Sequence, residues 1–234
     1  MMTSLSAAEW GILSLSLRVA LWSVVISLPL AIFVAYLLAR WRFYGKSFFD
    51  AFVHLPLVLP PVVVGYALLI LFGRQGPLGA LLEQYFGIVL IFRWTGAALA
   101  CAVMGFPLMV RAIRLSLEGV NRELEAAAST LGAGRWWILI TITLPLAMPG
   151  ILTGVLLSFA RSLGEFGATI TFVSNIPGET STLPLAIYSL TQVPGGDAQA
   201  LRLSLISVLL SLAALMFSEM LVRRAHRRVK GQHA

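Results

Sequence analysis

The chain has 234 residues, of which 59% are hydrophobic and only 12% are charged, and its formal net charge is +7. A soluble domain carries about a quarter charged residues, so the composition argues against a soluble enzyme and against a nucleic-acid-binding domain. The mean hydropathy of +0.89 indicates that most of the chain lies in lipid.

Five stretches are long and apolar enough to cross a bilayer, which needs about 20 mostly apolar residues. They are residues 13–38, 48–72, 94–110, 137–160 and 201–222. We therefore predict an all-α polytopic membrane protein with one domain, residues 1–234, and five spans. A further stretch, residues 163–190, is apolar in patches but broken by glycines and prolines. It predicts an irregular or re-entrant segment, which is tolerated at membrane depth only when it is buried in protein or lines a water-filled path.

The second span contains Pro56, Pro60 and Pro61 within a short distance. Each proline removes a hydrogen-bond donor and clashes with the preceding turn, so we expect this span to be kinked. Two interpretations stay open. The prolines are an ordinary feature of a membrane helix, or they bend the span beside a transport pathway.

Basic residues gather after the first span, between the third and fourth, and after the fifth. These are Arg40, Arg42 and Lys46, then Arg111, Arg114, Arg122 and Arg135, then Arg223, Arg224, Arg227, Arg228 and Lys230. The loops on the other side hold fewer. Because basic loops stay on the cytoplasmic side, we predict an external N-terminus and an internal C-terminus.

A conspicuous amphipathic segment lies between the third and fourth spans. Apolar residues recur every three or four positions along residues 113–131, with charges on another face, which is typical of a helix. Gly119 interrupts the pattern, and Asn121 is then placed to cap a new helix with Glu125 in its first turn. Gly132 is placed to end this helix in the left-handed conformation. We expect a helix of roughly ten residues here.

This short helix favours a protein partner over a lipid surface. A helix that rests on lipid headgroups is expected to have a cationic polar face, whereas this face also carries Glu123 and Glu125. A small alanine-rich face, held between two spans, suits insertion into a protein groove.

The pattern of Ala126-Ala127-Ala128, Gly132, Ile142 and Leu144-Pro145 resembles the EAA loop of the permease subunits of bacterial ABC importers. When Gly132 is aligned, the consensus glutamate position falls on Ala126, and Glu125 stands one residue early. One step rotates a side chain by about 100° on a helix. The stretches HLPLVLPPVVVGY, FPLMVRAIRLSLEGV and FARSLGEFGATITFVSNIPGET are similar to molybdate permease subunits, and the last is shared in similar form with sulfate and thiosulfate permeases.

The resemblance implies a bundle like that of type I ABC importer permeases, with five transmembrane helices and a cytoplasmic coupling helix in the loop of residues 120–136. It implies a permease in the bacterial cytoplasmic (inner) membrane that imports molybdate, with tungstate as a second candidate. The partners would be a second copy of the chain, a cytoplasmic ATPase subunit that carries ATP and Mg²⁺, and an external molybdate-binding protein. The ATPase contacts would be Leu124, Glu125, Ala126, Ala127, Ala128, Leu131, Gly132, Ala133 and Gly134.

The residues themselves support this division of labour. The phosphate loop G-x-x-x-x-G-K-[ST] is absent, because Arg40 stands where the first glycine should precede Gly45-Lys46. We therefore expect no catalytic residues, no bound cofactor and no ATP hydrolysis in this chain alone.

The predicted pathway or gate lies at the end of the fourth span. Arg161 and Glu165 are four residues apart and can pair on one helical face. Either they neutralise each other and brace the helix, or Arg161 helps a dianion past the outer gate with nearby hydroxyl donors, including Thr171. The predicted pathway residues are Ser158, Arg161, Ser162, Gly164, Glu165, Gly167 and Thr169.

Two alternatives stay open at this point. A sulfate or thiosulfate importer permease would share the oxyanion-type motif. A proton-coupled secondary anion carrier would need a relay of buried ionisable groups and often shows inverted repeats, and neither is evident. Asp50 and His54 could supply two metal ligands, but no third ligand follows at a suitable spacing, so no metal site is predicted.

Overall fold

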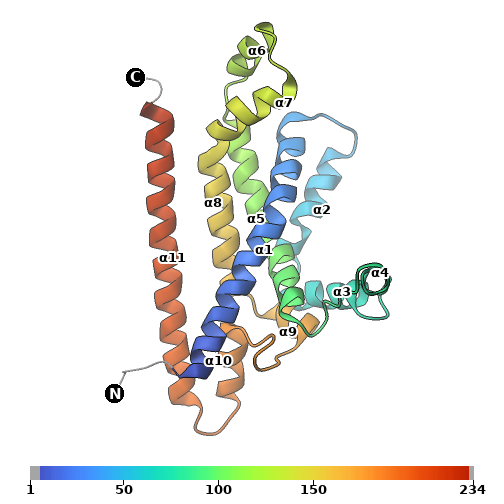
Figure 1. The fold of residues 1–234 in the computed structure, drawn as a ribbon, viewed down its shortest axis with the longest axis vertical. Coiled ribbons are helices and arrows are strands. Elements are labelled where there is room, and N and C mark those ends of the chain that lie inside the picture. Colours follow the sequence, from blue (N-terminus) through green and yellow to red (C-terminus); the bar gives the residue numbers. More distant parts are fainter. Residues whose placement is uncertain (1–5, 232–234) are drawn as a thin grey trace.

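The structure is a computed structural model that describes residues 6–231, and this part of the chain consists of helices and loops without strands. The helices are α1 (Ala7–Arg40), α2 (Lys46–Val58), α3 (Pro61–Phe72), α4 (Pro77–Phe86), α5 (Trp94–Glu118), α6 (Arg122–Thr130), α7 (Arg135–Ile138), the π-helix η1 (Leu139–Thr143), α8 (Leu144–Leu163), α9 (Gly167–Val173), α10 (Leu183–Thr191) and α11 (Asp197–Gly231). In Figure 1, α6 and α7 lie at one end of the bundle and α10 at the other.

Five membrane crossings agree with the lengths and hydropathy of these helices. Among the described residues, four segments are long and apolar enough by themselves, namely Ala7–Arg40, Trp94–Glu118, Arg135–Leu163 and Asp197–Ala214. Helices α2 and α3 pass the same test only as a pair, and they are bent by 111°. The all-α fold is therefore confirmed, and these helices allow four crossings, or five if the bent pair forms one span.

The second span is broken rather than merely kinked, at the site that its prolines indicated. Helix α2 ends at Val58, and α3 begins at Pro61 with Pro60 as its N-cap residue. Proline is well suited to the first position of a helix, since its missing N–H would be unpaired there. The Pro60-Pro61 pair thus ends one helix and starts the next in a new direction.

The third helix also differs from the sequence expectation, since it continues to Glu118 well past the predicted end at Val110. Arg111 and Arg114 limit how deep this segment can lie in hydrocarbon, but arginine is a good helix former. These arginines therefore mark where the helix leaves the hydrocarbon region, and the helix itself continues beyond them.

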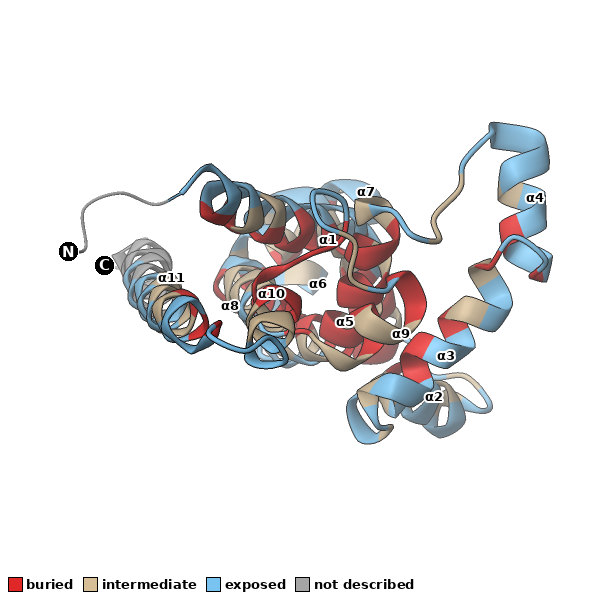
Figure 2. Cartoon of the chain, turned by 90° about the horizontal axis from the view of Figure 1, so that it is seen from below, coloured by how far each residue is buried: buried red, intermediate tan, exposed pale blue. Residues whose placement is uncertain are grey.

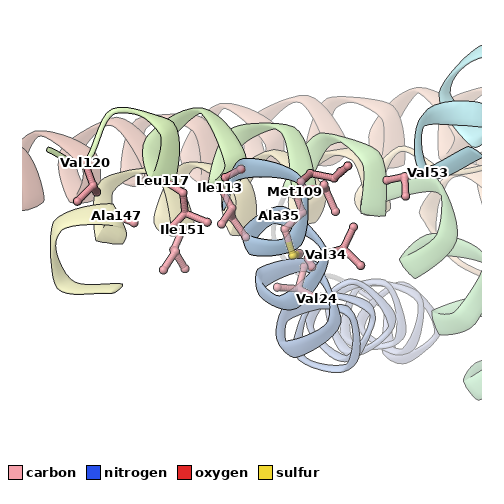
Figure 3. Close-up of a cluster of buried hydrophobic side chains, with 14 residues drawn as sticks. Val24, Val34, Ala35, Val53, Met109, Ile113, Leu117, Val120, Ala147 and Ile151 are labelled. Atoms are coloured by element: carbon pink, nitrogen blue, oxygen red, sulfur yellow. The ribbon is translucent and has the colours of Figure 1, made fainter. Parts of the chain in front are cut away.

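The core is built where α1, α5 and α8 pack together. Its main cluster includes Val24, Ala35, Met109, Ile113 and Ile151, all buried. Figure 3 shows the side chains of α5 in a row beside those of α1 and α8. Residues far apart in the sequence thus form one rigid three-helix unit.

Glycines allow α8 to approach α5 closely. A Cβ atom on Gly150 would lie 2.1 Å from the Cβ of Ser116, and one on Gly154 would lie 3.0 Å from the carbonyl oxygen of Met109. Gly150 and Gly154 form a G-x-x-x-G step, and small residues of this kind let membrane helices pack backbone to backbone.

The segment 163–190 is irregular, as its glycines and prolines indicated, and it is buried in part. It forms the short helix α9, a turn and then α10. Thr169, Phe172 and Val173 of α9 are fully buried, and α9 packs on α3 and α5. Helix α9 therefore lies inside the protein, whereas the turn that follows it is exposed at residues 177–179 and buried again at residues 180–182.

The outer helices keep large apolar side chains exposed. Figure 2 shows mostly exposed residues on α2, α4 and the described part of α11, while α5 and α9 carry many buried ones. On α2 and α3, the exposed side chains include Phe48, Phe52, Val58, Val62 and Tyr66. Apolar faces of this kind contact lipid or another protein chain.

Candidate functional site

The loop between α5 and α8 contains the capped short helix that the sequence predicted. Helix α6 has nine residues, and the side chain of Asn121 accepts a hydrogen bond of 2.9 Å from the backbone N–H of Glu123. Gly132 has φ +87°, in the left-handed region that glycine takes without strain. The chain then turns and resumes as α7 at Arg135.

No residue of α6 is buried. Leu124 is 41% exposed and Leu131 is 88% exposed, and Ala126 and Ala127 are exposed between them. This side of the loop therefore presents apolar side chains on the surface, where a partner protein can reach them. Ala128 is half-buried.

Glu125 points the other way, toward its own chain. Its Oε1 atom accepts a hydrogen bond of 2.8 Å from Arg40 Nη2 and another of 2.7 Å from Thr143 Oγ1. Arg40 ends α1, and Thr143 is the last residue of η1. The sequence did not indicate this contact, because Arg40 lies 85 positions away and Thr143 lies 18 positions away.

The π-helix places Thr143 at this contact. Leu139–Thr143 form one π-helical turn between α7 and α8, a rare conformation that occurs mostly as single turns and often at functional sites. A groove of about 730 Å³ opens beside it, lined by residues of α1, α6, α7 and η1 that include Phe33, Tyr36, Trp136 and Leu139. Glu125 therefore connects α6 to α1 and to η1 at the edge of this groove.

At the opposite end of α8, Arg161 and Glu165 form an ion pair with 2.6 Å between Nη1 and Oε2. Glu165 is 1% exposed, and its Oε1 atom accepts a hydrogen bond of 2.8 Å from the backbone N–H of Ala168. The carboxylate thus joins the end of α8 to the first turn of α9, where a negative charge is favourable.

The hydroxyls predicted near the gate are turned into the fold. Ser158 and Thr169 are fully buried, and Ser162 is 5% exposed. Ser162 donates to the Ser158 carbonyl at 2.8 Å and lies 2.9 Å from the hydroxyl of Ser23 on α1, while Thr169 donates to the Phe166 carbonyl at 2.8 Å. These groups brace helices in the conformation seen here, and their role in a pathway stays a prediction.

The two gate glycines lie in different surroundings. Gly164 is exposed, with no atom within 4 Å of a Cβ built on it. A Cβ on Gly167 would lie 2.7 Å from the Cβ of Pro61, and a Cβ on Gly65 would lie 2.6 Å from the carbonyl oxygen of Ala168. Helices α3 and α9 therefore pack too closely for larger residues at these positions.

A second charged cluster links α2 to α5. Arg114 binds Asp50 at 2.9 Å and Glu118 at 2.8 Å. The Nδ1 atom of His54 lies 2.9 Å from the Asp50 carbonyl oxygen. The Asp50 carboxylate is thus committed to an arginine, and among the described residues no three His, Cys, Asp or Glu side chains gather as a metal site.

Several helices long and apolar enough to cross a membrane, a short buried helix α9 and an exposed amphipathic helix in one loop are features of a membrane-embedded component of a transport system. The chain belongs to the family of binding-protein-dependent transport system inner membrane components, whose family model matches residues 27–227.

Named relatives agree with this family. The chain is 59% identical over 224 residues to the molybdenum transport system permease protein ModB of Escherichia coli (strain K12), covering 96% of this chain and 98% of that protein. It is 58% identical to the Haemophilus influenzae ModB, covering 94% and 96% of the two chains. The sulfate transport system permease protein CysW of Synechococcus elongatus is more distant, at 41% identity over 74% of this chain and 61% of CysW.

The fold agrees with a solved importer. The crystal structure of a bacterial ABC transporter involved in the import of the acidic polysaccharide alginate matches with a TM-score of 0.74 and 19% identity, covering 94% of this chain and 80% of that one. At this identity the likeness concerns the fold alone. The predicted type I ABC importer permease fold is confirmed.

Proposed function

We propose that this chain is the permease subunit of an ATP-driven importer that moves molybdate into the cytoplasm. The observation that carries this proposal is 59% identity along nearly the whole chain to a permease named for molybdenum transport. Tungstate is a second candidate substrate, since it shares the shape and charge of molybdate. The sulfate alternative has less support, because the match to a sulfate permease is weaker and covers less of both chains.

The chain works with partners that supply energy and substrate. A separate cytoplasmic ATPase subunit binds ATP and Mg²⁺, in keeping with the lack of a phosphate loop in this sequence. A second copy of the chain completes the pathway, and an external binding protein delivers the anion. The exposed apolar faces of α2 and α3 are candidate surfaces for the second copy.

The loop of residues 120–136 faces the cytoplasm, where α6 docks on the ATPase through its exposed residues, including Leu124, Ala127 and Leu131. The chain lies in the bacterial inner membrane with its N-terminus outside and its C-terminus inside. The basic residues between the third and fourth spans support this orientation, as the positive-inside rule requires. Those after residue 222 have side chains outside the described part of the structure.

Arg161 lowers the electrostatic barrier for the dianion at the outer end of α8. Its side chain is 28% exposed and its charge is partly cancelled by Glu165. A site that must release its ion binds weakly, and a single, half-neutralised arginine meets this requirement better than a cage of cations. Selection among anions then rests with the binding protein.

The test is uptake into proteoliposomes that contain the permease with its ATPase subunit, supplied with binding protein and ATP. Molybdate should accumulate, and a large excess of sulfate should not compete. Uptake of sulfate in preference to molybdate would support the sulfate alternative, and uptake that continues without ATP would reject the importer.

A further inference from the structure

We propose that Glu125 is a positioning residue that clamps the short helix α6 to two membrane helices at once, instead of meeting the ATPase. This inference rests on the proposed function, because it assigns α6 as the helix that receives movement from the ATPase. It concerns residues within this chain alone: Glu125, Arg40 and Thr143.

Helix α6 has few other ways to hold its position against the bundle. None of its nine residues is buried, so packing contributes little. Within the described part of the chain, Glu125 is the residue of α6 whose side chain hydrogen-bonds outside the loop; those of Asn121, Glu123 and Thr130 bond locally. Glu125 is therefore the side chain through which α6 is hydrogen-bonded to the rest of the bundle.

The two partners of Glu125 belong to different spans. The Arg40 side chain is 8% exposed and stands at the end of α1, and Thr143 is 1% exposed at the end of η1, directly before α8. A buried arginine needs a carboxylate partner, because an unpaired buried charge is strongly unfavourable. One oxygen atom, Oε1, accepts from both groups, so a single carboxylate joins α6 to α1 and to the π-helical turn.

This geometry explains the register of the acidic residue. On the consensus pattern the glutamate would fall at position 126, but Ala126 is exposed on α6. Moving the acid back by one residue turns it by about 100°, from the exposed side to the side that faces Arg40 and Thr143. A displacement of α6 then pulls on α1 and on the π-helical turn together. Helix α1 packs on α5, and so does α8, which continues directly from the π-helical turn.

The experiment compares Glu125→Ala with Glu123→Ala, a matched change on the same helix at a side chain that bonds only to Asn121. Uptake of molybdate and hydrolysis of ATP are measured together in proteoliposomes. Uptake per ATP should fall about tenfold in Glu125→Ala, as expected for loss of a charged hydrogen bond, and should stay near the wild-type value in Glu123→Ala. Equal ratios in both variants would overturn the clamp.

Thr143 provides a second variant pair if Glu125→Ala fails to reach the membrane. Thr143→Val keeps the shape and removes the donor, whereas Thr143→Ser keeps the donor. The first should lower uptake per ATP, and the second should restore it. If both variants behaved alike, packing and not the hydroxyl contact would matter at this position, and the clamp would be rejected.

Two further measurements separate the clamp from the proposed function. Hydrogen–deuterium exchange of residues 122–130 needs no partner, and Glu125→Ala should exchange about tenfold faster there than Glu123→Ala. If the wild-type complex fails to transport while exchange still responds, the proposed function is wrong and the clamp remains. If Glu125→Ala abolishes co-purification with the ATPase subunit without changing exchange, Glu125 is a partner contact and the clamp is wrong.

Discussion

Arg161 and Glu165 form an ion pair whose two ends lie in different surroundings. The Arg161 side chain is 28% exposed, whereas the Glu165 side chain is 1% exposed and also accepts a hydrogen bond from the backbone of Ala168. The acid is therefore a structural part of the junction between α8 and α9. The Arg161 guanidinium remains partly exposed. The ion pair can therefore brace the helix through Glu165 while Arg161 contributes to the pathway.

Arg161→Gln should slow uptake of molybdate and tungstate by similar factors and leave their relative preference unchanged. It also leaves a buried carboxylate without its partner, which costs about 3 kcal/mol, and the double change with Glu165→Gln should recover part of this loss. Competitive uptake at a fixed amount of binding protein and thermal unfolding in detergent measure the two effects. An altered ratio of the two anions would show that the permease itself discriminates.

Gly132→Val should uncouple transport, because a β-branched residue is strongly disfavoured at a φ of +87°. No atom lies within 4 Å of a Cβ at this position, so the effect comes from the backbone and not from a steric clash. Gly132→Asn is the control, since asparagine tolerates the left-handed region. Uptake should fall in the valine variant while the protein still reaches the membrane. Equal uptake in both variants would contradict the assigned turn.

Gly150→Ala should lower the stability of the bundle by about 1–3 kcal/mol, the usual cost of overpacking a core. The added Cβ would lie 2.1 Å from the Ser116 Cβ and 2.9 Å from the Ala112 carbonyl oxygen. Ser116→Gly in the same chain removes the first contact and should restore part of the loss. Gly11→Ala is the matched control, because nothing lies within 4 Å of its Cβ on helix α1. Thermal unfolding that ranks the two alanine variants equally would refute the packing of α5 on α8.

The order of the elements could be predicted from local patterns. Hydropathy gave the spans, the prolines of the second span marked its break, and Asn121 and Gly132 marked the ends of α6. Each of these depends on residues that are close in the sequence and on the conformations they allow.

Contacts between distant residues could not be predicted in this way. The Glu125–Arg40 and Ser23–Ser162 contacts join residues 85 and 139 positions apart, and no periodicity links their positions. The π-helical turn also has no signature in residues 139–143, where LITIT suits an ordinary helix interior or a strand equally. The one-residue shift of Glu125 from the consensus position is visible in the sequence. Its consequence, the contact with Arg40, depends on where α1 ends in space.

The orientation in the membrane can be tested with single cysteines in a Cys101→Ala background. One would be placed at Ser4, which lies outside the described residues, and the other at Gly231, the last described residue of α11. An impermeant thiol reagent applied to intact cells should label the first and miss the second. The reverse labelling would reject the external N-terminus.

The most direct test of an importer permease for molybdate is ATP hydrolysis by the permease reconstituted with its ATPase subunit and binding protein. Hydrolysis should rise when the binding protein is loaded with molybdate, and it should stay at the basal rate with sulfate or with no anion. The ATPase subunit without this chain should show no such response. Hydrolysis that ignores molybdate, together with uptake driven by a proton gradient alone, would contradict the account.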